Sequence, residues 1–154
     1  MEGTYRLSEE DNPSAEDIEA VRWGLSRFNQ QIAGDDGFAP LTLLLRDPDG
    51  AVVGGLLGGT YWHWLYVETL WLDAPLRRMG WGSRLLQRAE SIALERQCIA
   101  VHLDTTSFQA RGFYERHGYQ VWGVLDDLPP GHQRIFLAKR LPNPRPHAAK
   151  PAET

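Results

Sequence analysis

The sequence contains a single cysteine, no long apolar run and no excess of basic residues. Because Cys98 has no second cysteine to pair with, no intrachain disulfide can form, which favours a reducing compartment. The longest apolar stretches, such as Ala51–Leu57, are far shorter than the roughly 20 residues of a membrane helix. Lys and Arg total 16 against 20 Asp and Glu, so the net charge of -4 argues against nucleic acid as the main partner. No basic region followed by an apolar run opens the chain, so we expect no secretory signal and a cytoplasmic location.

Length and composition are those of one globular domain. The chain has 154 residues, of which 42% are hydrophobic and 23% are charged. We expect the domain to occupy residues 1–141. Residues 142–154 are rich in proline and lack apolar periodicity, which predicts a flexible C-terminal tail.

Apolar periodicity and turn residues predict a mixed α/β (α+β) fold. Helices are expected after Ser14, over 82–96, and after the possible N-caps Thr105, Thr106 and Ser107, with Gly118 closing the last one. The expected strands are 4–7, 41–46, 51–57, 61–72, 98–103, 119–125 and 134–138. Short hairpin connections favour antiparallel pairing, whereas the strand–helix–strand unit from Tyr66 to Leu103 predicts one parallel pair with a right-handed crossover.

A glycine-containing loop between a predicted strand and a predicted helix is the strongest functional signal. It reads Arg77, Arg78, Met79, Gly80, Trp81, Gly82 and Ser83. The first N–H groups of a helix have no internal partner, and the helix dipole adds partial positive charge to them. Glycines let a bulky phosphate approach the backbone. Glycines serving a tight loop beside solvated arginines are the plain alternative, but the combination favours a diphosphate-binding loop.

Two familiar phosphate-binding patterns fit this loop poorly. A dinucleotide-binding site would place G-x-G-x-x-G directly after the strand, but here Leu85 occupies the third small position. A P-loop requires a lysine after its last glycine, and this loop has none.

A second motif identifies a better match. The spacing Arg77, Gly80, Gly82 is R-x-x-G-x-G, and the block from Ala110 to Tyr119 reads A-x-x-F-Y-x-x-x-G-Y. Together, in this order and spacing, they resemble the acetyl-CoA signature of the GNAT family of N-acetyltransferases. The resemblance covers roughly Tyr5 to Leu141 and is strongest from Tyr66 to Gly123.

The resemblance implies a mixed, mostly antiparallel sheet, flanked by helices, that splays at a central parallel strand pair. The pantetheine arm of acetyl-CoA would lie in the splay, against the backbone of Leu70, Trp71 and Leu72. The diphosphate would bind the N–H groups of 77–83, with Ala110 and Tyr114 also contacting the cofactor. Ser107 stands where the family often has Asn, so its hydroxyl has a shorter reach than the usual amide.

The implied reaction is direct attack of a primary amine on the thioester in a ternary complex. The resemblance makes Tyr114 the general acid for the leaving thiolate, with packing beside Phe113 as the alternative. Glu68 is the candidate general base, directly or through water, and Asp104 is its rival. A backbone N–H near Leu70 would polarise the carbonyl.

Other features leave their roles open. The histidines and Cys98 show no metal-ligand spacing, so we expect no metal, and Cys98 is better explained as a buried side chain than as a nucleophile. The aromatic run Tyr61–Trp64 could line an acceptor pocket, a subunit interface or the core. The acceptor could be a small molecule or a protein amine, and a homodimer would fit the resemblance. Transfer of another acyl group, O-acylation, or a non-catalytic CoA-binding module remain alternatives.

Overall fold

A computed structural model describes residues 4–142 of the chain. The chain divides into two compact units, the first ending at Asp36 and the second beginning at Gly37. The predicted tail at 142–154 lies almost entirely outside the described residues. No helix in the described range is long and apolar enough to cross a membrane.

The first unit holds one helix, α1 (Ala15–Ala33). Its start is the predicted one, because the Ser14 hydroxyl accepts a hydrogen bond of 3.0 Å from the Asp17 N–H. It ends at Gly34, whose positive φ of 77° suits glycine. The predicted strand at Thr4–Leu7 is wrong: this segment contains no strand. Its alternating pattern is short and no neighbouring strand pairs with it.

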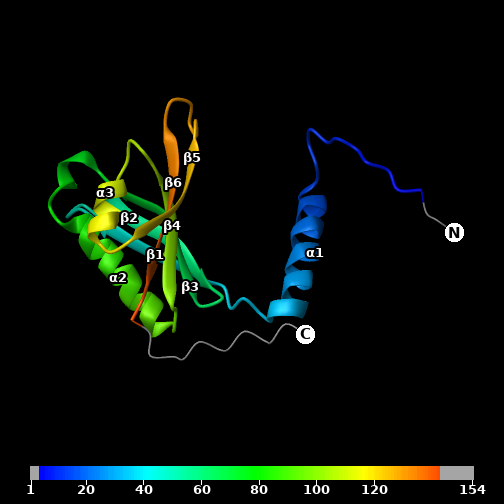
Figure 1. Ribbon diagram of the computed structural model, residues 1–154, viewed down its shortest axis with the longest axis horizontal. Helices are drawn as coiled ribbons and strands as arrows, with labels where there is room; N and C mark the ends of the chain where they lie inside the picture. Colours follow the sequence, from blue (N-terminus) through cyan, green and yellow to red (C-terminus); the bar gives the residue numbers. More distant parts are fainter. Residues whose placement is uncertain (1–3, 143–154) are drawn as a thin grey trace. The chain divides into compact units, whose positions relative to one another are not determined.

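The second unit is a sheet with two α-helices and a short 3-10 helix (Figure 1). Its elements are β1 (Ala39–Arg46), β2 (Val52–Tyr61), β3 (Trp64–Leu72), η1 (Ala74–Leu76), α2 (Trp81–Glu95), β4 (Ala100–Thr106), α3 (Arg111–Arg116), β5 (Gln120–Asp126) and β6 (Gln133–Arg140). The six strands lie in the order β1-β2-β3-β4-β6-β5.

The predicted parallel pair is confirmed at the centre of the sheet. Strands β3 and β4 run parallel, with α2 as the crossover, and all other neighbours are antiparallel. The parallel register joins only Trp64–Val67 to Ala100–Leu103. Beyond Val67 and Leu103, β3 and β4 no longer pair with each other, although each still pairs with its antiparallel neighbour. This separation is the predicted splay.

Both helices α2 and α3 contribute to one apolar core with the sheet. Leu85, Leu86, Ala89 and Ala93 of α2 are buried at helical spacing, so one face of this helix packs on the strands. The strands contribute alternate residues such as Leu65 on β3. Because this face packs against the sheet, the N-terminus of α2 is held in a fixed position beside the splay.

Strand β3 has a bulge relative to β2 at the point where its pairing with β4 ends. Leu57 pairs with Thr69 and Gly58 pairs with Val67, so Glu68 is the extra residue on β3. A bulge bends its strand and redirects side chains, and bulges recur beside active sites. Here the bend falls at the first residue after the parallel pairing ends, so it helps to open the splay.

Two local predictions are wrong. Strand β2 continues through Gly58–Thr60, and the hairpin turns instead at Trp62 and His63, which adopt φ of 41° and 60°. Thr105, Thr106 and Ser107 do not cap α3, since β4 includes both threonines and the helix begins at Arg111 after Ala110, with no side-chain cap among the described residues. Gly118 does close α3, with φ of 86°.

Candidate active site

Two adjoining cavities occupy the splay and the loop beside it. The first, of about 530 Å³, lies between the diverging strands and is called the strand cavity. The second, of about 630 Å³, lies against the start of α2 and is called the loop cavity. Both are lined by Leu70, Leu72, Arg77, Gln109, Ala110 and Tyr114. The shared lining, which includes five of the predicted site residues, makes the two cavities neighbours, and together they are called the cleft.

The loop cavity reaches the N-terminus of α2. Gly80, at φ of 84°, precedes the helix, and no side-chain hydrogen bond caps this end in the described part of the chain. The first intrahelical bond of this end runs from the Arg84 N–H to the Gly80 carbonyl, at 3.1 Å. The amides of Trp81, Gly82 and Ser83 precede this bond and keep the donor capacity of a helix start. They are therefore available to an anion in the cavity.

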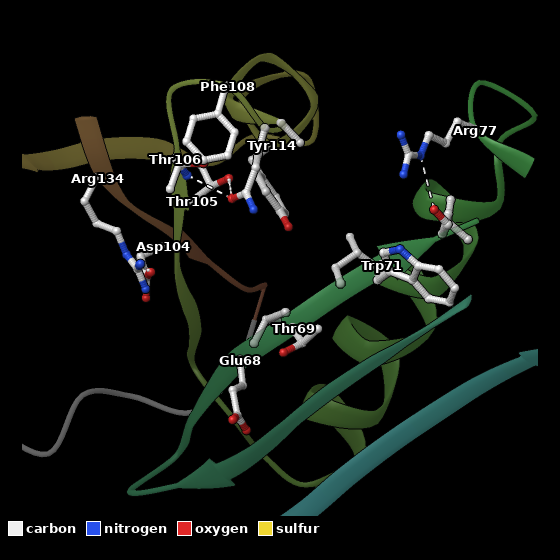
Figure 2. A pocket seen from close by; sticks show the side chains of 15 residues that line it. Glu68, Thr69, Trp71, Arg77, Asp104, Thr105, Thr106, Phe108, Tyr114 and Arg134 are labelled. Carbon is white, nitrogen blue, oxygen red and sulfur yellow. Dashed lines mark hydrogen bonds and ion pairs between the residues drawn. The ribbon is translucent and has the colours of Figure 1, made fainter. Parts of the chain in front are cut away.

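Glycine and arginine shape this end of the cleft. A Cβ at Gly82 would lie 3.4 Å from the Phe113 ring and 3.7 Å from Leu72 Cδ1, so any larger side chain would extend into this narrow space. Arg77 lines both cavities, and its Nε donates to the Leu72 carbonyl at 3.1 Å. This bond fixes a guanidinium beside the loop (Figure 2).

Tyr114 lies where the two cavities meet. Its ring is buried against Phe113 and Tyr119, with centroid separations of 5.1 and 5.7 Å. Its hydroxyl projects into the strand cavity (Figure 2). Burial, reinforced by the negative charge of Asp104, raises the pKa of Tyr114 to about 12. The phenol is therefore protonated at neutral pH and can donate a hydrogen bond into the cavity.

The two candidate bases have different surroundings. Asp104 is bound to Arg134 through an Nε–Oδ2 contact of 2.5 Å, with 16% of the Asp104 side chain exposed. Glu68 is exposed at the bulge and forms no ion pair with any described residue. Figure 2 shows Glu68 and Tyr114 on opposite sides of the strand cavity. Asp104 is therefore engaged by a cation, whereas the Glu68 carboxylate has no ion-pair partner among the described residues.

One buried polar atom in the cleft has no partner. The Thr106 hydroxyl oxygen is the single buried side-chain nitrogen or oxygen in the described range without a hydrogen bond. Thr106 lines the strand cavity. A buried hydroxyl without a partner costs free energy, and a polar ligand in the cavity would satisfy it. The cleft thus has the character of a binding site.

Most of the predicted site residues line this cleft, and three do not. Arg78, Gly80 and Ser83 join Gly82 around the loop cavity, while Glu68 and Trp71 line the strand cavity. Met79 and Trp81 line neither cavity, and the Trp81 ring instead stacks under the Arg84 guanidinium at 4.3 Å. Ser107 also lines neither, because its hydroxyl accepts a hydrogen bond of 3.1 Å from the Gln133 N–H.

Sequence reasoning missed several residues that line the cleft. They include Thr106, Phe108, Gln109, Arg116 and Arg134. Arg134 reaches the site because β6 pairs with β4, so no local sequence pattern predicts its position there. Arg116 lies within the second motif, at one of its unspecified positions, and its charge was a signal that could have been weighed.

The remaining candidate features lie elsewhere in the second unit. Cys98 is 1% exposed and lines neither cavity. The Tyr61 hydroxyl meets His102 Nε2 at 2.7 Å, and the Trp64 ring packs edge-on to His102. No group of three or more His, Cys, Asp or Glu among the described residues could hold a metal ion.

Comparison with known proteins places these features in context. Residues 3–119 match the model of the acetyltransferase (GNAT) family. A blasticidin-S acetyltransferase of Streptomyces morookaense is 46% identical over 93 residues, covering 60% of this chain and 68% of that protein. An acetyltransferase of Agrobacterium fabrum is 35% identical, covering 85% of this chain and 96% of the relative. The crystal structure of an acetyltransferase from Bacillus cereus superposes with a TM-score of 0.80 at 34% identity, covering 87% and 98% of the two chains.

Proposed function

The chain belongs to the GNAT family of acetyltransferases, and from this premise we propose that it moves the acetyl group of acetyl-CoA to a primary amine of a small molecule. One observation carries the proposal: the cleft joins an uncapped helix N-terminus to a splay containing a buried, protonated phenol. The diphosphate would bind at the first feature, and the thioester would lie near the second.

The backbone supplies the positioning. The amides of Gly82 and Ser83, with Arg77 beside them, suit an anion with two phosphate groups. The segment Leu70–Leu72 is free of a parallel partner, so its N–H and carbonyl groups facing the splay can bond the pantetheine amides. The same segment would offer the N–H of Leu70 to the acetyl oxygen as negative charge develops there.

Tyr114 and Glu68 are assigned the proton transfers. The amine must lose a proton before it attacks, because a free alkylamine is mostly cationic at neutral pH. Glu68 takes that proton, directly or through water, and Tyr114 donates to the leaving sulfur. The buried position of Cys98 supports direct attack over an acyl-cysteine intermediate, since its sulfur is far from being solvent-accessible and lines neither cavity.

The acceptor is proposed from the relatives and from the site. The name of the Streptomyces relative specifies blasticidin S as an acceptor of that protein, which puts a small-molecule amine first for this chain. The exposed Glu68 carboxylate beside the strand cavity would attract a cationic amine. A protein amine, O-acylation and transfer of another acyl group stay as alternatives, as do a homodimer and a cytoplasmic location.

The first experiment is CoA release from acetyl-CoA across a panel of amines that begins with blasticidin S. We expect turnover with at least one amine, and a fall of roughly 100-fold in kcat for Tyr114→Phe with acetyl-CoA affinity retained. Tyr119→Phe is the matched control. Its hydroxyl bonds Glu90 at 2.8 Å and it lines neither cavity, so this change should lower stability but keep kcat. Normal turnover by Tyr114→Phe would remove Tyr114 from the chemistry.

The order of substrate binding tests direct attack. With the active amine, initial rates at varied acetyl-CoA and amine concentrations should give intersecting double-reciprocal lines, as a ternary complex requires. Parallel lines, or an acetylated protein detected by mass spectrometry, would instead indicate a covalent intermediate. Binding of acetyl-CoA without turnover across a broad panel would favour a non-catalytic CoA-binding module.

A further inference from the structure

We propose that Arg116 binds the 3′-phosphate of CoA and makes this chain select CoA over 3′-dephospho-CoA, an inference that rests on the proposed function. CoA carries a diphosphate and a separate phosphate on the ribose 3′ oxygen. The helix start and its flanking arginines account for the diphosphate only. The second anionic group needs a second cationic site.

The loop cavity has charge of one sign. Among the described residues, Arg77, Arg78 and Arg116 are the charged residues that line it, and none of its described lining residues is a carboxylate. Arg77 and Arg78 belong to the loop before α2, whereas Arg116 comes from the end of α3. The cavity therefore presents positive charge from two separate elements, which matches a ligand with two separate anionic groups.

Within residues 4–142, the Arg116 side chain is not held by another side chain. It forms no ion pair or side-chain hydrogen bond with any described residue. Arg111, on the same short helix, is instead held by Glu115 through a contact of 2.7 Å. A guanidinium without a carboxylate partner keeps its full set of donors for a phosphate, which it can bind in a bidentate manner.

The local packing directs this guanidinium along the cavity. Gly112 lies one turn before Arg116 and also lines the loop cavity. A Cβ built at Gly112 would be 3.3 Å from Arg116 Nη1, so the guanidinium folds back over a position without a side chain. The glycine thus leaves room for the charged group at the cavity wall rather than out in solvent.

Calorimetric titration with CoA and with 3′-dephospho-CoA tests the assignment. The protein should bind CoA at least ~10-fold more tightly than dephospho-CoA, the range for a hydrogen bond between charged groups. Arg116→Ala should weaken CoA binding to the level of dephospho-CoA and leave dephospho-CoA binding unchanged. Arg116→Gln, which keeps most of the side-chain length, should behave in the same way.

Two control variants separate this site from general charge effects. Arg111→Ala removes one positive charge from the same helix and should keep the preference for CoA. Arg78→Ala should weaken both ligands by a similar factor, because the diphosphate is common to both. Among these three variants, Arg116→Ala alone should abolish the preference for CoA over dephospho-CoA.

The outcomes distinguish the inference from the function beneath it. If the unmodified protein binds neither ligand, the proposed function fails. If it binds both equally, or if Arg116→Ala keeps the preference for CoA, the cleft is retained as a CoA site and the role of Arg116 is overturned.

Discussion

Tyr114 is held in its protonated form by its surroundings. The apolar surroundings and the charge of Asp104 raise the pKa of its phenol to about 12. As a proton donor it should then remain competent throughout the neutral and mildly alkaline range. The same residue also packs in the core, so the packing alternative and the catalytic assignment are compatible.

Glu68 is predicted to be the general base, acting directly or through water. Glu68→Gln keeps the size of the side chain but removes the carboxylate that would take the proton of the amine, so kcat should fall by roughly 100-fold without a change in acetyl-CoA affinity. A normal kcat in Glu68→Gln would transfer the role of base to Asp104 or to water.

His102 is predicted to make stability depend on pH. Burial lowers the pKa of His102 below its ordinary value, so the folded protein holds the neutral ring and the unfolded chain takes up a proton more readily. Stability from this group is present above about pH 6.5 and is lost as pH falls through the lowered pKa. Urea unfolding at pH 7.5 and pH 5 should show this loss.

His102→Asn is the variant that isolates the effect. It removes the hydrogen bond with Tyr61, so we expect lower stability at both pH values. The difference between the two pH values should nevertheless shrink relative to the unmodified protein. An unchanged difference would show that other groups cause the acid sensitivity.

At the scale of elements, the start of α2 carries the binding argument. Gly82→Glu would place bulk and negative charge among the amides that face the loop cavity. We expect this variant to lose measurable acetyl-CoA binding in calorimetry. Gln87→Glu adds the same charge at an exposed position within the same helix and should bind normally. Retained affinity in Gly82→Glu would place the cofactor elsewhere.

The pairing of β2 with β3 gives a stability prediction. A Cβ at Gly58 would lie 2.1 Å from the Tyr66 carbonyl oxygen, so Gly58→Ala must shift backbone at the bulge. We expect a loss of about 2 kcal/mol or more in urea unfolding. Gly123→Ala is the control, because its Cβ would meet the Phe136 side chain at an ordinary contact distance of 3.9 Å, and it should change stability little. Equal effects of the two changes would contradict the close approach at Gly58.

The elements predicted well from the sequence were those with a strong local signal. The apolar face of α2 and the Ser14 cap of α1 each depend on a few neighbouring residues. The turn at Trp62 and His63 could not be predicted in this way, because a positive φ is uncommon for residues other than glycine. The pairing of β2 with β3 imposes it. The expected strands ended at Leu57 and began again at Tyr61, but Gly58 and Gly59 lie inside β2, where they allow close backbone approach.

At the scale of the second unit, strand pairing brings together residues that are far apart in the sequence. The parallel pair was predicted from the strand–helix–strand unit, and the resemblance supplied the splay. Arg134 joins the cleft through the antiparallel pairing of β6 with β4, far from either motif in the chain. The sequence motifs therefore predicted the residues that line the loop cavity better than those that β4 and β6 bring to the strand cavity.

The central claim is that the first amides of α2 bind the diphosphate of CoA. Titration of the ¹⁵N-labelled protein with CoA, followed by NMR, observes these groups directly. The largest and saturable shifts should come from the amides of Trp81, Gly82 and Ser83, whereas the distant end of α2 near Glu95 should be unaffected. Saturable CoA binding that leaves these three amides unshifted would contradict the account.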